Sequence, residues 1–185
     1  MKKLIILTII GTLTWFTNGC QDITVGYLLT ESANYNPDTL VIKSEKSLDI
    51  TAPTLQEVPN PEYEYFINEK HMTPEELANK GIYPTMIVEM GAGEEYIKQK
   101  WGQPWVSAPI EGVEGTSQVI VSIKNITSIQ GDPGKLWGVL FVRGDGTFEV
   151  PLHHDVPVGR YVISLNFKNE GYSKDINDCF TIIVK

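Results

Sequence analysis

The sequence predicts an all-β protein, an antiparallel sandwich with one short helical insertion at about residues 74–80. The first observation is the alternation of apolar and polar side chains over residues 159–169, which is the pattern of a half-buried strand. The side chains expected on the buried face of that strand are Tyr161, Ile163, Leu165 and Phe167. The second observation is that strand-like segments follow one another across short turns without interleaved helices, which favours an antiparallel sandwich.

The composition supports a packed core and argues against two classes of partner. The chain has 185 residues, enough for one domain or two small ones, and 42% of them are hydrophobic. The formal net charge is −8, from 15 basic and 23 acidic residues. Binding to nucleic acid needs Lys and Arg clustered against phosphates, and the sequence has no such basic stripe. The same charge argues against electrostatic binding to an anionic membrane surface.

Residues 1–19 are predicted to be a secretory signal peptide. Lys2 and Lys3 give a positive start, and residues 4–16 are mostly apolar. That apolar run is too short to cross about 30 Å of hydrocarbon as a helix. A cleaved targeting segment is therefore favoured over a membrane-spanning helix.

Residues 17–20 (TNGC) resemble a bacterial lipobox. The resemblance implies that the Cys20 thiol is lipidated and that residues 1–19 are removed. The polar composition of residues 21–36 predicts that residues 20–37 form a lipidated tether, with a short strand over 25–29 (VGYLL) as the alternative there. Two or more acyl chains hold a protein on a bilayer, because each buried methylene contributes about 0.8 kcal/mol. A plain secreted protein with an incidental cysteine is the alternative. On the lipoprotein interpretation Cys179 has no disulfide partner, and its apolar segment predicts a small buried side chain.

Residues 38–104 are expected to form an N-terminal β region, either part of the same sandwich or a small separate domain. Strands are predicted at 38–43, 63–67 and 82–90, where β-branched, aromatic and other apolar side chains gather. The prolines expected to prevent a helix in the segment that leads to the second of these strands are Pro53, Pro59 and Pro61.

The expected helical insertion carries the clearest local signal in this region. Thr73 can cap a helix, Pro74 suits the first helical position, and Glu76 completes a capping box. Gly81 supplies the stop. A helix over 74–80 has only about two turns, so we expect an insertion on a β scaffold and not a core element.

Residues 105–185 are predicted to form the sandwich itself. Strands are expected at 118–126, 135–143 and 178–185, in addition to the alternating segment described first. Trp137 lies within the second of these apolar runs and is therefore expected in the core.

The same stretch resembles the cadherin-like and immunoglobulin-like domains of bacterial surface proteins. In those domains a short strand ending in proline precedes a V-P-x-G-x-Y strand, a glycine-containing turn and a final apolar strand. The residues that match are Asp145, Gly146, Pro151, Pro157, Gly159, Tyr161, Asn169 and Gly171. Such sandwiches host many roles, so this resemblance concerns fold and not function.

The whole chain is similar to outer-membrane lipoproteins of Bacteroidota, through its TNGC segment and its opening DITVGYLLTESANYNPDTLVIK. Many of these lipoproteins accompany TonB-dependent systems that import nutrients. The resemblance implies lipid-anchored display on the outer membrane, at the cell surface or on the periplasmic face. It implies a glycan, another surface protein or a TonB-dependent transporter complex as the partner.

Residues 94–105 (EEYIKQKWGQPW) combine aromatic rings with amides and carboxylates. The candidate ligand-binding residues are Trp101, Trp105, Tyr96 and Gln103. Aromatic rings pack against the C–H faces of sugars while polar neighbours bond the hydroxyls. The alternative is that one or both tryptophans cover the edge of the core. A glycan binder should expose Trp101 or Trp105, whereas a structural or adhesive module should bury both and show an apolar patch or a free strand edge.

No metal, cofactor or catalytic role is expected. His153 and His154 are adjacent, so in a strand their side chains point to opposite faces and do not share an ion. Residues 91–96 (GAGEEY) lack the strand-before and helix-after setting of a dinucleotide loop, and no G-x-S-x-G elbow is present. The predicted function is a non-catalytic accessory lipoprotein that binds a glycan or sits in a nutrient-uptake complex. The alternative is a structural or adhesive module that binds another surface protein.

Overall fold

The computed structural model describes residues 26–116 and 118–185. The predicted signal peptide over 1–19 and the predicted lipidation at Cys20 lie outside the described residues. Within these two ranges, no helix is long and apolar enough to cross a membrane.

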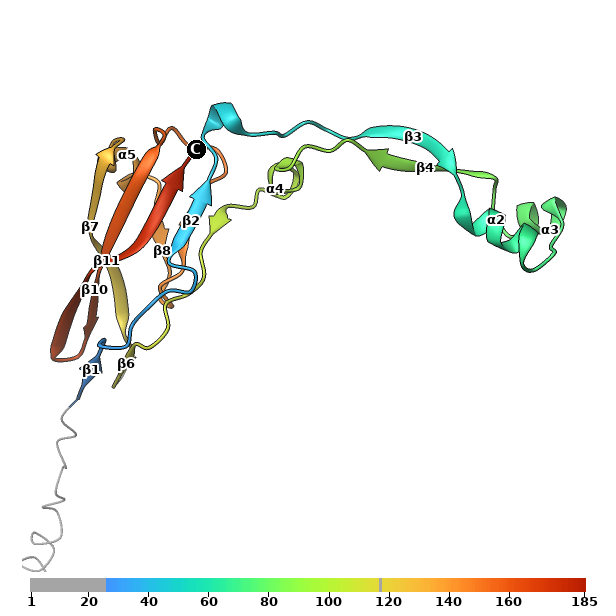
Figure 1. Ribbon diagram of the computed structural model, residues 1–185. Helices are drawn as coiled ribbons and strands as arrows, with labels where there is room; N and C mark the ends of the chain where they lie inside the picture. The colour runs from blue at the N-terminus through green and yellow to red at the C-terminus, as the bar shows by residue number, and fades with distance from the viewer. Residues whose placement is uncertain (1–25, 117) are drawn as a thin grey trace, which may run out of the picture.

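One layer of the protein is a four-stranded sheet (Figure 1). Its strands, in spatial order, are β2 (Thr39–Ile42), β11 (Tyr172–Val184), β10 (Gly159–Asn169) and β7 (Ile120–Gln130). The pairings of β10 with β11 and with β7 are antiparallel, whereas β2 runs parallel to β11. The long alternating segment predicted from the sequence is therefore a central strand, with a neighbour on each side.

The second layer is made of short strands. Strands β5 (Trp105–Val106), β9 (Phe148–Val150) and β8 (Phe141–Val142) form a sheet in that order, with antiparallel pairing. A further pair, β1 (Leu28–Leu29) with β6 (Glu114–Gly115), closes one end of the molecule. The two layers confirm the predicted all-β sandwich.

The core lies between these layers and is filled by the predicted face of β10. Its four apolar side chains, Tyr161, Ile163, Leu165 and Phe167, are 0% exposed. Strand β11 adds Phe180, whose ring lies 4.7 Å from that of Tyr35 and 4.9 Å from that of Phe148, centroid to centroid. Tyr35 and Leu28 are core residues, so the predicted tether over 20–37 is wrong from Leu28 onward. Their packing stabilises the fold because it removes large apolar side chains from water.

A long arm projects from the sandwich (Figure 1). We use "the arm" for residues 54–90: a two-stranded hairpin of β3 (Thr54–Pro59) and β4 (Thr85–Met90) that carries two helices at its tip. These helices are α2 (Pro61–Asn68) and α3 (Pro74–Asn79). Of the predicted β region over 38–104, β2 belongs to the sandwich sheet and the arm stands apart from it.

The chain enters the sandwich and sends out the arm at opposite ends. Strand β1 lies beside the turn between β10 and β11. A Cβ added at Gly26, just before β1, would contact Glu170 and Tyr172 of that turn. The arm departs at the other end, where the backbone N–H of Ser44 donates to the carbonyl of Lys185, at 2.7 Å. The C-terminus and the base of the arm are therefore neighbours.

The prediction of a single helical insertion is wrong, because helices also form where strands were expected. Helix α3 forms as predicted, with the full capping box between Thr73 and Glu76. Helix α2 replaces the strand expected at 63–67, because the Asn60 side chain accepts a bond from the Glu62 N–H (3.0 Å) and Pro61 occupies the first turn. A proline there starts a helix instead of stopping one.

A second helix occupies part of the apolar run over 135–143. Helix α5 (Pro133–Trp137) begins with the same device, because the Asp132 side chain accepts a bond from the Gly134 N–H at 2.9 Å. Only β8 remains of the predicted strand. Trp137 is 48% exposed, so its predicted place in the core is wrong.

Candidate ligand-binding ledge beside helix α4

Two short helices mark the base of the arm. The 3-10 helix η1 (Glu45–Ser47) follows β2, and α4 (Tyr96–Trp101) follows the return from β4. Helix α4 ends at Gly102, whose φ of 60° is left-handed and suits glycine. Residues 96–101 thus form a helix that leads back into the sandwich.

Glu95 fixes α4 to the sandwich. Its side chain is 6% exposed and lies 2.8 Å from the Lys43 Nζ, just beyond β2. It also accepts a hydrogen bond from the Asp49 backbone N–H at 3.0 Å. Burial raises the pKa of Glu95, but the bonds from Lys43 and Asp49 outweigh it, so the net pKa is lowered. The carboxylate stays ionised and ties the start of α4 to the segment that leads from β2 into the arm.

The structure separates the two candidate tryptophans. Trp101 ends α4 with its side chain 68% exposed, whereas Trp105 in β5 is 9% exposed and belongs to the core cluster. The Lys98 Nζ lies 5.1 Å from the Trp105 ring centroid and covers its outer side. Trp105 therefore occupies the core-edge position that was the alternative for both rings, and Trp101 is the ring available to a ligand.

The other two candidates flank Trp101. Gln103 is exposed, and Tyr96 is half-buried at the start of α4. The Lys100 Nζ lies 5.8 Å from the Tyr96 ring and 6.0 Å from the Trp101 ring. Three of the four predicted residues therefore lie on one exposed segment.

A hollow of about 470 Å³ lies beside the end of α4. Its lining residues are Gln99, Gly102, Pro104, Pro151, Leu152 and His153. The His153 Nδ1 lies 2.9 Å from the Glu45 carboxylate, and its Nε2 contacts the Gln99 amide oxygen. We use "the α4 ledge" for Trp101 together with this hollow. Sequence analysis missed Gln99 and His153 as a pair because 54 residues separate them.

The neighbouring histidine has a different environment. His154 is 7% exposed, and its Nδ1 accepts the Val156 N–H at 3.3 Å. Burial lowers the pKa of His154, so its ring is neutral near neutral pH. Within the described part of the chain, no group of three or more His, Cys, Asp or Glu side chains is placed to hold a metal ion.

Comparisons with known proteins give one weak likeness. No protein-family model and no curated protein matches the sequence. The structure is similar to that of a SusE-like surface-located polysaccharide-binding protein from the heparin utilisation locus of Bacteroides thetaiotaomicron, with 16% sequence identity and a TM-score of 0.36. The match covers 84% of this chain and 28% of that one. The chain thus spans under a third of that protein's length, and the likeness is too low to carry an argument about function.

Proposed function

We propose that this protein is a non-catalytic lipoprotein that binds a glycan at the α4 ledge. The observation that carries the proposal is the 68% exposure of Trp101, a large aromatic ring held out at the end of a helix that Glu95 anchors. An exposed tryptophan offers a large flat ring against which the apolar face of a ligand can pack.

A glycan site also needs polar side chains that bond the sugar hydroxyls, and the α4 ledge offers such groups. Gln99 and His153 offer an amide and an imidazole at the wall of the hollow, and Gln103 offers a free amide beside it. A hollow of about 470 Å³ lies within the range of about 300–1,000 Å³ that small-ligand sites occupy. Trp101 is not among the residues that line the hollow, so the proposed ligand is a chain of several sugars, with one ring on Trp101 and another at the hollow.

The cellular setting is part of the same proposal. The resemblance of residues 17–20 to a lipobox supports lipidation at Cys20, and the resemblance to Bacteroidota lipoproteins supports display on the outer membrane. A protein displayed there captures polysaccharide for import, and a TonB-dependent transporter complex is the partner that would receive it.

Affinity gel electrophoresis tests the glycan proposal. The protein from Gln21 onward is run through gels that contain plant, host or microbial polysaccharides, beside Trp101→Ala. Trp137→Ala is the matched control, because Trp137 is also exposed, at 48%, but lies on α5. Retardation that is lost in the first variant and kept in the second supports the α4 ledge. Retardation that survives Trp101→Ala, or no retardation on any polysaccharide, overturns it.

A further inference from the structure

The hairpin of the arm exposes large apolar side chains on both of its faces, and on the first face they stand beside two glutamates. Residues paired across the hairpin share a face, so Leu55 lies with Glu89 and Ile87 lies with Glu57. On this first face Leu55 and Ile87 are each 70% exposed. Both are large aliphatic side chains that the hairpin exposes to solvent.

The second face is uncharged. It carries Met86 opposite Val58, Val88 opposite Gln56, and Met90 opposite Thr54. The exposed fractions are 41% for Met86 and 46% for Met90. Methionine side chains are flexible and polarizable, and they adapt to the surface of a partner.

Nothing among the described residues covers either face. Strand β3 pairs with β4 and with no third strand, and the hairpin has no sheet or helix layered on it along its length. An isolated two-stranded hairpin is marginally stable in water. A strand with the sequence TMIVEM, apolar on successive residues, is typical of strands that are covered on both sides.

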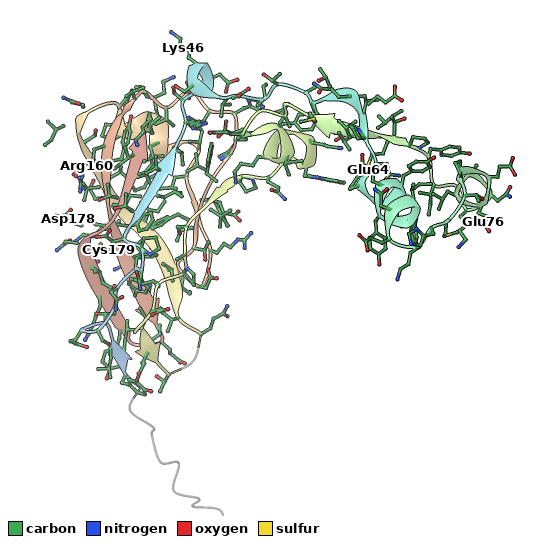
Figure 2. All side chains as sticks on the ribbon, turned by 45° about the vertical axis from the view of Figure 1, so that its right-hand side comes forward. Lys46, Glu64, Glu76, Arg160, Asp178 and Cys179 are labelled. Atoms are coloured by element: carbon green, nitrogen blue, oxygen red, sulfur yellow. The ribbon has the colours of Figure 1, made fainter. Side chains whose placement is uncertain are left out.

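The charge of the arm indicates what kind of partner would cover the hairpin. Residues 54–90 hold seven glutamates and two lysines, which leaves a formal charge of −5. The glutamates concentrate at the tip, where Figure 2 labels Glu64 on α2 and Glu76 on α3. Two arms of this charge repel each other, which disfavours a second copy of the chain as the cover, and a basic partner surface is favoured.

We propose that the arm inserts into an apolar groove of another protein, whose end carries Lys and Arg side chains that face the acidic tip. A groove with two apolar walls covers both faces of the hairpin at once, which a flat surface does not. The hairpin has two unpaired edges, and the edge that faces the floor of such a groove leaves its backbone free to pair with a strand there. This inference rests on the arm and is independent of glycan binding at the α4 ledge.

Crosslinking in intact producing cells tests the insertion. A photo-crosslinking amino acid is placed in the full chain at Leu55 or at Met86, which lie on opposite faces. The control position is Ile129 on β7, which is fully exposed on the sandwich. The expected result is one and the same polypeptide attached from both arm positions and none from Ile129. An adduct with a second copy of this chain, two different polypeptides from the two faces, or no adduct overturns the proposal.

The crosslinked polypeptide, once identified by mass spectrometry and purified, tests the charge argument. Glu64→Gln with Glu69→Gln removes two charges from the arm, and Glu111→Gln with Glu114→Gln removes two from the sandwich. At low salt we expect the first pair to slow association about tenfold and the second pair to leave the rate unchanged. The reason is that electrostatic steering depends on the charges near the surface that the partner binds. Equal effects of the two pairs, or association that ignores salt, would contradict a basic groove.

Discussion

Tyr161 shows how one residue joins three segments of the sandwich. Its ring is 0% exposed, and its hydroxyl donates to the Pro157 carbonyl at 2.7 Å and accepts the Asp132 N–H at 3.3 Å. A tyrosine that bonds back to the backbone a few residues upstream is a corner device of β-sandwiches. Gly131 allows this approach, because a Cβ there would lie 2.3 Å from the hydroxyl. The turn before β10 and the start of α5 are thus held by one side chain.

Two substitutions separate the ring of Tyr161 from its hydroxyl. Tyr161→Ala is expected to lower the free energy of unfolding by about 3–5 kcal/mol, because it removes a buried aromatic ring. Tyr161→Phe is expected to lower it by about 1 kcal/mol, because the ring stays and two hydrogen bonds are lost. Urea unfolding followed by fluorescence measures both. A loss of under about 1 kcal/mol for the alanine variant would mean that the ring does not support the core.

Cys179 is half-buried and packs against the core, with its Sγ 3.5 Å from the Ile163 carbonyl. Burial raises the pKa of its thiol to about 11. At pH 8 only about one thiol in a thousand is then ionised, and the thiolate is the reactive form. In Cys20→Ala we therefore expect slow labelling of Cys179 by a thiol reagent at pH 8 and fast labelling in denaturant. Equally fast labelling in both states would show that the thiol is free in the fold.

At the scale of elements, the junction between α4 and β2 depends on the ionised Glu95. Its net lowered pKa keeps it charged at lower pH in the folded protein than in the unfolded chain. The stabilisation is therefore complete above the ordinary pKa of 4.5 and is lost as pH falls through the lowered one.

Glu95→Gln tests this junction. At pH 7 we expect the variant to lose about 1–3 kcal/mol of stability, because a charged acceptor of buried bonds becomes neutral. Its stability should then change less than that of the unmodified protein between pH 5 and acid. Glu94→Gln is the control, because the Glu94 side chain also contacts Lys43 but is 77% exposed. Equal pH profiles for the protein and Glu95→Gln would show that another carboxylate dominates.

The elements also show which parts of the fold follow from local sequence. Strand β10 was predictable because its alternation over eleven residues matches a two-sided environment. Helix α2 was missed because Pro61 was weighed as a breaker, and α5 was missed because residues 135–143 were interpreted as one apolar strand. In both places a proline in the first turn follows a capping Asn or Asp. The local signal was present there, and its interpretation was wrong.

The α4 ledge was predictable only in part. The segment with Trp101 and Trp105 was found from its composition, but which ring is exposed depends on the end of α4 at Gly102 and the pairing of β5 with β9. The contact of His153 with Glu45 joins residues 108 positions apart. Nothing in the local pattern carries such information, because it arises from packing between layers.

At the scale of the whole molecule, the sandwich is expected to be stable without the arm. Replacement of residues 54–90 by a short Gly-Ser linker removes β3, β4, α2 and α3, whose contacts are made within the arm. The melting temperature of the sandwich, measured by near-ultraviolet circular dichroism, should change by less than about 4 °C, the shift that about 1 kcal/mol produces at this size. Loss of a cooperative transition would show that the arm completes the core.

The chain enters the sandwich at one end and the arm leaves at the other, so the proposed lipid anchor would make the sandwich a spacer between the bilayer and the arm. Strand β10 has 11 residues and, at about 3.3 Å per residue, sets a height of roughly 35 Å between the two ends. If the lipid anchors the entry end, everything carried at the other end stands at that elevation above the bilayer and extends sideways over it (Figure 1). The length of two central strands then determines which neighbours in the membrane are tall enough to be met.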